Sequence, residues 1–301
     1  MNERAGLEPG QGRNAEMQDF KDRVVVVTGG AEGIGKAIAA RAAAAGMKLV
    51  LADIDGARLE ATVAEFTRQG VVAVGLRTDV SKEAEVEALA ALAFERFGNV
   101  HLLVNNAGVG HNRPVWETTQ ADWDWVMGVN LYGVIHGLRA FIPTMLSRGE
   151  PGHIVNTASM AGLTSQPGLA IYNASKHAVV TVSEGLYHDL RLRQSKLGVS
   201  VLCPAWVKTR IHLSERNRPG LAGAGVGAGA PALDPVADKV GRAIMAAVES
   251  GIPVETVADS VFDGITAGRF YILTHPTYKG AIKVRLEDIL EERPPTLLPS
   301  L

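Results

Sequence analysis

Tyr172 and Lys176 are four residues apart in the stretch Tyr172-Asn173-Ala174-Ser175-Lys176. Four residues make about one helical turn, so on a helix the two side chains lie on the same face. An ammonium group beside a phenol favours the phenolate and lowers its pKa from about 10, which would let Tyr172 exchange protons near neutral pH. The same spacing is frequent on solvated helices, and for the pair alone that interpretation is favoured. The rest of the chain decides between the two.

The composition indicates a globular protein with a sizeable core, since 47% of the 301 residues are hydrophobic and 21% are charged. The 30 Lys and Arg residues nearly balance the 32 Asp and Glu residues, and no basic run is interleaved with aromatics, which argues against a nucleic-acid partner. No apolar run is long enough to span a bilayer, and the sole cysteine, Cys203, fits a reducing compartment. We therefore expect a cytoplasmic protein without a membrane partner.

Short apolar runs alternate with longer helical stretches along most of the chain. The predicted strands are residues 24–28, 48–52, 71–77, 101–105, 152–157, 199–203 and 270–274. The predicted helices are residues 34–45, 57–69, 82–97, 123–147, 172–196, 235–249 and 254–267. Nearly all-apolar strands joined by helices predict an α/β fold, with a doubly wound parallel sheet of about seven strands and helices on both faces.

The ends of this pattern predict the domain organisation. We expect one catalytic domain over residues 20–292, a disordered leader over residues 1–19 and a loose tail over residues 293–301. Residues 210–234 interrupt the pattern with five glycines interleaved with alanine. A long loop directly after a parallel strand lies at the carboxyl edge of the sheet, where ligands bind, and predicts a mobile substrate lid. A solvated linker is the alternative.

A glycine-rich turn follows the first predicted strand and opens an Ala-rich helix. It reads Thr28-Gly29-Gly30-Ala31-Glu32-Gly33-Ile34-Gly35. Glycines permit a tight turn and a close approach of the backbone to a diphosphate, whose charge the free amides and the positive end of the helix dipole favour. The context of strand, turn and helix therefore predicts a dinucleotide site, with a plain turn as the alternative.

Asp53 ends the second predicted strand, where the dinucleotide fold places an acid that hydrogen-bonds the adenosine ribose hydroxyls. Its carboxylate would repel a 2′-phosphate. Glu32 adds a second negative charge, and Ile54 supplies no guanidinium group for such a phosphate. NAD is therefore predicted in preference to NADP, and a role as a helix cap alone is the alternative for Asp53.

Further motifs follow the later predicted strands. They are Asn105-Asn106-Ala107-Gly108, Asn130 in the next helix, Ser159 thirteen residues before Tyr172, and Pro204-Ala205-Trp206-Val207-Lys208-Thr209. In this order and spacing, the chain from Phe20 to Thr274 resembles the classical short-chain dehydrogenase/reductase family, which implies a Rossmann-like single domain. Ala205 departs from the glycine more usual in the segment after the sixth strand, which would narrow the space near a nicotinamide.

The resemblance implies four catalytic residues. Tyr172 would be the acid/base, and Ser159 would hold the substrate oxygen. Lys176 would lower the pKa of Tyr172 and hydrogen-bond the nicotinamide ribose, while Asn130 would position a water that links Lys176 to solvent. The implied cofactor residues are Gly29, Ala31, Glu32, Gly33, Ile34, Asp53, Ile54, Asp79, Val80, Asn106, Ala107, Gly108, Tyr172, Lys176, Pro204, Ala205, Val207 and Thr209.

These residues predict an NAD(H)-dependent oxidoreductase that interconverts a secondary alcohol and a ketone. The expected pocket is mainly apolar and suits a hydrophobic or cyclic substrate. Its predicted residues are Val109, His111, Met160, Leu169, Trp206 and Ile211. The histidines show no spacing typical of zinc ligands, and hydride chemistry needs no metal, so no metal is expected.

Two other functions stay open, and a partner is expected. Reduction of a 3-oxoacyl thioester would use the basic residues near the lid, which are Lys208, Arg210, Arg216 and Arg218. A non-catalytic nucleotide-sensing protein would have no need of the proton-transfer residues. The predicted helices over residues 123–147 and 172–196 carry apolar positions on more than one face, which together with the resemblance predicts a homodimer or homotetramer.

Overall fold

The structure is a computed structural model that describes residues 17–219 and 235–297. Its centre is a seven-stranded parallel sheet in the order β3-β2-β1-β4-β5-β6-β7, which confirms the predicted Rossmann-like doubly wound sheet. The strands are β1 (Val24–Thr28), β2 (Lys48–Asp53), β3 (Ala73–Arg77), β4 (Leu102–Asn105), β5 (Gly152–Thr157), β6 (Leu197–Cys203) and β7 (Tyr271–Leu273). Every residue of β1, β4, β5 and β6 is buried, as expected for strands covered on both faces.

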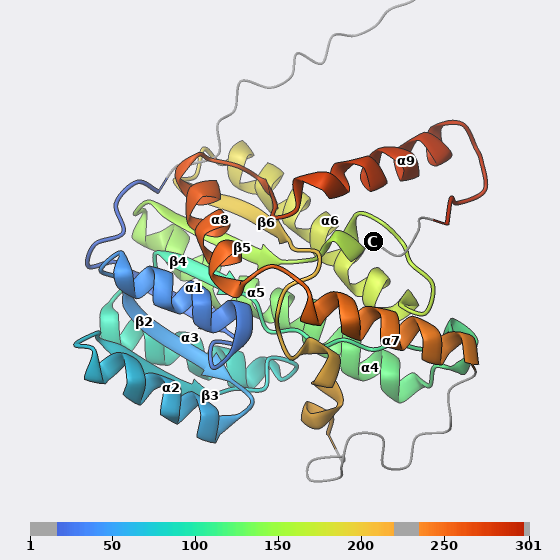
Figure 1. The fold of residues 1–301 in the computed structure, drawn as a ribbon. Helices are drawn as coiled ribbons and strands as arrows, with labels where there is room; N and C mark the ends of the chain where they lie inside the picture. The colour runs from blue at the N-terminus through green and yellow to red at the C-terminus, as the bar shows by residue number, and fades with distance from the viewer. Residues whose placement is uncertain (1–16, 220–234, 298–301) are drawn as a thin grey trace, which may run out of the picture.

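Helices cover both faces of the sheet (Figure 1). One face carries α1 (Gly33–Ala44), α2 (Gly56–Arg68) and α8 (Val254–Thr266), whose apolar side chains form one core cluster with β1 and β2. The other face carries α3 (Glu83–Phe97), α5 (Gly133–Arg148) and α6 (Ala170–Leu192), which contribute to a second cluster. The strand order reverses between β1 and β4, and in such sheets the crevice at that point, at the carboxyl ends of the strands, is the usual place for a ligand.

The predicted helix over residues 123–147 is helical throughout in the structure, but a π-helical turn that was not predicted divides it. The structure has α4 (Gln120–Met127), a π-helical turn (η2, Gly128–Tyr132) and then α5. A capping box between Thr119 and Asp122 starts α4 earlier than predicted. Gly133 lets α5 approach the loop after β3 closely, because a Cβ there would lie 2.7 Å from a side-chain carbon of Val80.

The segments outside the core pattern also differ from expectation. Met17, inside the predicted leader, is only 3% exposed and packs in the core, so the ordered chain begins before residue 20. Residues 211–217 of the predicted lid form a 3-10 helix (η4, Ile211–Asn217), while residues 220–234 lie outside the described chain. The remaining elements are η1 (Val115–Glu117), η3 (Met160–Gly162), α7 (Pro235–Glu249), η5 (Pro276–Tyr278) and α9 (Lys279–Leu290), and α9 was not predicted.

Part of the predicted C-terminal tail is bonded to α9. Within the predicted tail, the amide of Thr296 and the guanidinium group of Arg293 both bond to Asp288 of α9, while residues 298–301 lie outside the described chain. In the described ranges, no helix combines the length and the apolar character needed to cross a membrane.

Candidate active site

A cavity of about 1290 Å³ opens at the carboxyl ends of the central strands and brings nearly all the predicted site residues together. The predicted cofactor residues on its wall are Gly29, Glu32, Gly33, Ile34, Asp53, Ile54, Asp79, Val80, Asn106, Ala107, Gly108, Tyr172, Lys176, Pro204, Ala205, Val207 and Thr209. We call the part formed by residues 29–35, Asp53 and Asp79 the nucleotide end. The wall also contains Ser159 and the six predicted pocket residues Val109, His111, Met160, Leu169, Trp206 and Ile211. We call the part of the cavity around these six residues the substrate end. Ala31 and Asn130 are buried behind the wall.

The Gly-rich turn (residues 29–35) depends on missing side chains. Gly29 has φ +64°, and a Cβ there would lie 3.0 Å from the Cα of Ala107. A Cβ on Gly35 would lie 2.0 Å from the carbonyl oxygen of Gly29, so no side chain fits. The Asn106 amide donates to the carbonyl of Thr28 over 3.0 Å and ties the turn to the loop after β4. The turn therefore presents backbone amides at the start of α1, the arrangement that a diphosphate needs.

Asp53 lies beside this turn with its carboxylate held by backbone amides. One oxygen accepts from the amide of Ala31 over 3.1 Å and the other from that of Asp55 over 3.0 Å. Burial raises the pKa of Asp53, and these two amides oppose the rise. The cap of α2 is Asp55, which accepts from the amide of Arg58 over 3.0 Å, so Asp53 is not needed as the cap.

Glu32 is surrounded by three guanidinium groups that the sequence did not lead us to expect. It forms ion pairs with Arg58 of α2 and with Arg216 of η4, and Arg210 approaches it to 3.4 Å. The charge of Glu32 is therefore compensated, and only Asp53 carries the argument against a 2′-phosphate. The same pairs engage Arg210 and Arg216, so they are not free to form a basic surface for an acidic carrier.

Tyr172 and Ser159 meet at the centre of the cavity wall, where α6 begins and β5 has just ended. Ser159 caps η3 by accepting from the amide of Ala161 over 3.1 Å, and its hydroxyl donates to the carbonyl of Pro204 over 3.3 Å. Burial raises the pKa of Tyr172, and the neighbouring Ser159 hydroxyl partly opposes the rise. The phenol is therefore protonated at neutral pH and able to donate a proton.

Lys176 lies one turn along α6 and is 2% exposed. Its ammonium group donates to the carbonyl of Thr157 over 2.9 Å and lies 5.8 Å from the centroid of the Tyr172 ring. Burial lowers the pKa of Lys176 to about 8. The shared helix face is as predicted, but the pKa of Tyr172 is raised and not lowered, because burial disfavours the phenolate while the Lys176 ammonium group donates to Thr157.

Asn130 occupies the π-helical turn η2 and has no exposed surface. Its side chain accepts from the Val109 amide over 2.8 Å and donates to the Val109 carbonyl over 3.0 Å and to the Ser175 hydroxyl over 3.1 Å. A Cβ on Gly108 would lie 3.4 Å from Asn130 Oδ1 and 3.5 Å from Lys176 Nζ. The glycine therefore leaves room for both polar groups behind the same stretch of wall.

Asp79, Val80 and Thr209 also take part in contacts of their own. Asp79 accepts from the amide and the hydroxyl of Ser81, over 3.0 and 2.7 Å, so it both lines the cavity and holds the entry to α3. Val80 is buried. Thr209 lies against the Gly-rich turn, since a Cβ on Gly33 would be 3.6 Å from its methyl carbon.

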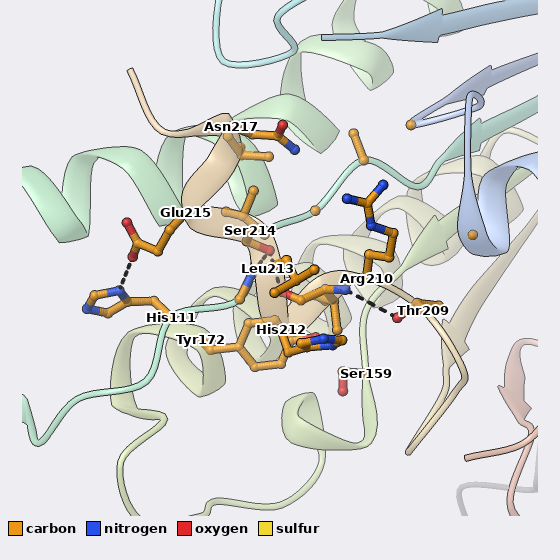
Figure 2. A pocket seen from close by; sticks show the side chains of 18 of the residues that line it. His111, Ser159, Tyr172, Thr209, Arg210, His212, Leu213, Ser214, Glu215 and Asn217 are labelled. Atoms are coloured by element: carbon orange, nitrogen blue, oxygen red, sulfur yellow. Dashed lines mark hydrogen bonds and ion pairs between the residues drawn. The ribbon is translucent and has the colours of Figure 1, made fainter. Parts of the chain in front are cut away.

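The substrate end contains residues that sequence reasoning missed. They are His212 of η4, Trp125 of α4, Ile244, Met245 and Val248 of α7, and Tyr278 of η5. Ile244, Met245 and Val248 could have been predicted, because their spacing gives one apolar face to a helix that follows the predicted lid. Nothing in the sequence marks Tyr278. Figure 2 shows the ring of His212 pointing toward Tyr172 and Ser159. His212 Nδ1 is buried and has no hydrogen-bond partner among the residues that the structure describes.

The η4 segment is fixed to the loop after β4 and to α4. The Gly110 amide donates to the Ser214 hydroxyl over 2.9 Å, and His111 contacts Glu215 over 3.4 Å (Figure 2). Arg218, just beyond η4, pairs with the buried Asp122 over 2.6 Å. The structure therefore places His111 on the wall of the cavity, in a contact that holds η4.

Comparison with known proteins gives one consistent result. A family model described as short chain dehydrogenase matches residues 23–219. A CLA biosynthesis dehydrogenase/reductase from Lactiplantibacillus plantarum is 36% identical over 93% of this chain and 97% of its own length. A C alpha-dehydrogenase from a Sphingobium species is 34% identical over 93% of this chain and 89% of its own length.

A solved structure agrees with these sequence relatives. The short chain dehydrogenase/reductase from Burkholderia phymatum, crystallised in complex with NAD, is 48% identical, with a TM-score of 0.89 over 95% of this chain and 100% of that one. Fold, motifs and relatives therefore agree, and the chain belongs to the short-chain dehydrogenase/reductase family, as an oxidoreductase that acts on CH–OH groups.

Proposed function

We propose that the protein is an NAD(H)-dependent oxidoreductase that interconverts a hydrophobic or cyclic secondary alcohol and the corresponding ketone. The observation that carries this proposal is that Tyr172 and Ser159 lie on the wall of one continuous cavity, between a nucleotide end and a largely apolar substrate end. The volume of about 1290 Å³ exceeds that of a typical small-molecule pocket, about 300–1,000 Å³, as a site for a dinucleotide and a substrate must.

The residues at the nucleotide end fit a nicotinamide dinucleotide. The amides that open α1 suit its diphosphate, and the Asp53 carboxylate suits the hydroxyls of its adenosine ribose. When bound, such a cofactor would accept or supply the hydride. Asp53 would exclude a 2′-phosphate, so we propose NAD rather than NADP, and the relative crystallised with NAD supports this choice.

The proton then falls to this chain's own side chains. In ketone reduction, Tyr172 would donate its phenolic proton to the substrate oxygen, and in alcohol oxidation it would accept that proton. Ser159 would hold the same oxygen and stabilise its developing charge. Lys176, with its pKa lowered to about 8, would then return a proton to the Tyr172 phenolate. We propose that Asn130 fixes the backbone at Val109, beside which a water would link Lys176 to solvent.

The substrate class follows from the walls of the substrate end. Met160, Leu169, Ile211 and Leu213 supply apolar surface there, and α7 adds Met245. Such walls gain free energy by covering hydrocarbon, at about 25 cal/mol per Å². Sugars and small acids would place polar groups against this apolar surface, so aromatic, alicyclic or steroid-like alcohols fit better.

A screen of secondary alcohols tests this function. The protein is incubated with each alcohol and with NAD or NADP in parallel, and the absorbance of reduced nicotinamide is followed. We expect turnover of apolar cyclic alcohols with NAD. Equal or faster rates with NADP would contradict the cofactor proposal, and no turnover of any alcohol with either cofactor would contradict the function itself.

We also propose that the protein is a homodimer or homotetramer. Tyr132 at the end of η2 is exposed, as are Leu146 near the end of α5 and Leu192 at the end of α6. Burial of these side chains between subunits would remove apolar surface from water. Size-exclusion chromatography with light scattering should give two or four chains per particle, and a monomer across the micromolar range would contradict the proposal.

A further inference from the structure

Glu32 belongs to the Gly-rich turn, yet two of its three cationic partners come from the segment that builds the substrate end. Arg210 and Arg216 lie 178 and 184 positions further along the chain. Arg216 forms an ion pair with Glu32, and the two side chains are 23% and 30% exposed. An ion pair this sheltered is screened less by solvent than one on the open surface.

The guanidinium group of Arg216 also shapes η4 itself. It donates to the carbonyl of Arg210 over 2.9 Å and to the carbonyl of Leu213 over 3.1 Å. Leu213 interrupts the helical geometry of η4, with φ −102° and ψ 22°. One side chain therefore holds the two carbonyls at the bend of η4 and, at the same time, joins η4 to the Gly-rich turn.

This bend carries the side chains that face the substrate. Ile211, His212 and Leu213 all line the cavity between the Glu32 pair on one side and the His111 contact on the other. Figure 2 shows His212 and Leu213 on this stretch beside Tyr172. A change in the position of η4 would move these three side chains together relative to the phenol.

We propose that Glu32 is a positioning residue for the substrate, in addition to its place at the nucleotide end. Through Arg216 it holds the bend of η4 and so sets the wall against which the alcohol binds. The proposal rests on the proposed function only for its kinetic test. Loss of the pair leaves the proton-transfer residues in place, so substrate affinity falls more than the rate of the bound complex.

The test compares Arg216→Gln with Arg58→Gln. Both variants remove one guanidinium group from Glu32, but Arg58 belongs to α2 and its other recorded partner is Asp55. We expect Arg216→Gln to raise KM for the alcohol about tenfold, equal to about 1.4 kcal/mol, with kcat lowered less than threefold, about 0.6 kcal/mol. The Kd of NAD, measured by protein fluorescence without alcohol, should stay within about twofold, which is about 0.4 kcal/mol.

Three further outcomes decide the matter. Arg58→Gln should leave the alcohol KM unchanged, and Arg216→Lys should recover part of the loss because a cation returns. The double variant Glu32→Gln/Arg216→Gln should raise KM no more than the worse single variant, because the two residues act through one pair. An equal rise in the Kd of NAD and in KM for Arg216→Gln would overturn the proposal, and so would additive effects in the double variant.

Limited trypsin digestion provides a readout that needs no substrate. We expect cleavage of the bond between Arg210 and Ile211 to be faster in Arg216→Gln than in the wild type, and unchanged in Arg58→Gln. Equal cleavage in both variants would overturn the positioning role. If the two variants digest as expected but the wild type oxidises no alcohol, the proposed function fails, while the positioning of η4 by Glu32 stands.

Discussion

At the nucleotide end of the cavity the glycines of the turn expose backbone amides, whereas the substrate end is formed by side chains from several elements. The Gly-rich turn works because Gly29 and Gly35 have no Cβ and leave the amides of the turn accessible. The substrate end instead gathers side chains from η3, η4, α4, α7 and η5. The nucleotide end therefore tolerates little variation in residue type, while the substrate end can change its chemistry without changing the fold.

The comparison also extends to stability. Cofactor binding at the nucleotide end depends on a backbone conformation that the fold also requires. A substitution there should therefore weaken cofactor binding and lower stability together. The residues between the two ends hold polar groups away from water, which opposes folding. Activity and stability should therefore separate at Tyr172 and Lys176, and the four predictions below test that separation.

The largest effect is expected for Tyr172→Phe. Removal of the hydroxyl leaves the substrate oxygen without a proton donor, and turnover should fall about a thousandfold or more. The Kd of NAD and the unfolding midpoint should stay near the wild-type values. Steady-state kinetics, a fluorescence titration and a denaturant melt provide these numbers. Wild-type turnover in this variant would show that another group moves the proton, and a nucleotide sensor would show no alcohol-dependent turnover in either protein.

Gly35→Ala should damage binding and stability together. The new Cβ would meet the Gly29 carbonyl at 2.0 Å, so the turn must shift. Overpacking of this kind typically destabilises by about 1–3 kcal/mol, and we expect the Kd of NAD to rise up to about 100-fold. Gly185→Ala is the matched control, because a Cβ on this exposed position of α6 meets nothing within 4 Å. It should stabilise by about 0.5–1 kcal/mol and leave binding unchanged.

Lys176→Met should lose activity but gain stability at neutral pH. The folded pKa of about 8 lies below the unfolded value of 10.5, so between these pH values the unfolded chain binds more protons. The resulting destabilisation, up to about 3 kcal/mol, is fully present below pH 8 and disappears as the pH rises to 10.5. Urea melts of both proteins at pH 7 and pH 10 measure it, and an equal difference at the two pH values would contradict the account.

The smallest effect is expected at the substrate end. His212→Phe keeps an aromatic ring but removes the nitrogen for which the described part of the chain offers no partner. Alcohols with a second oxygen near the reacting carbon should lose a factor of about three to ten in kcat/KM, about one neutral hydrogen bond, relative to matched alcohols without it. A uniform loss on both kinds of alcohol would indicate that the ring only fills space. The Kd of NAD should not change.

Sequence patterns predicted those parts of the molecule that local chemistry determines. The seven strands, the Gly-rich turn, and the wall positions of Ser159, Tyr172 and Lys176 follow from apolar runs and short motifs in which each residue type has one physical task. These features need no knowledge of which distant segments meet.

The parts that were missed depend on contacts between distant segments. The pairing of Glu32 with Arg216 spans 184 positions, and no local pattern announces it. The raised pKa of Tyr172 depends on how deeply the phenol is buried, which the spacing to Lys176 does not specify. Helix α9 has little separation of polar and apolar faces, so its sequence gave no periodic signal.

The π-helical turn at Gly128–Tyr132 contains, in effect, one inserted residue between α4 and α5. Each residue of an α-helix advances the chain by about 100° around the axis. Deletion of a single residue from this turn would make α4 and α5 one continuous helix, but α4 would be rotated by about that angle relative to α5. Asn130 would then leave Val109, and Trp125 would leave the cavity wall. The length of this short stretch therefore sets the rotation of α4 relative to α5, and with it the position of the substrate-pocket wall relative to the proton-transfer residues.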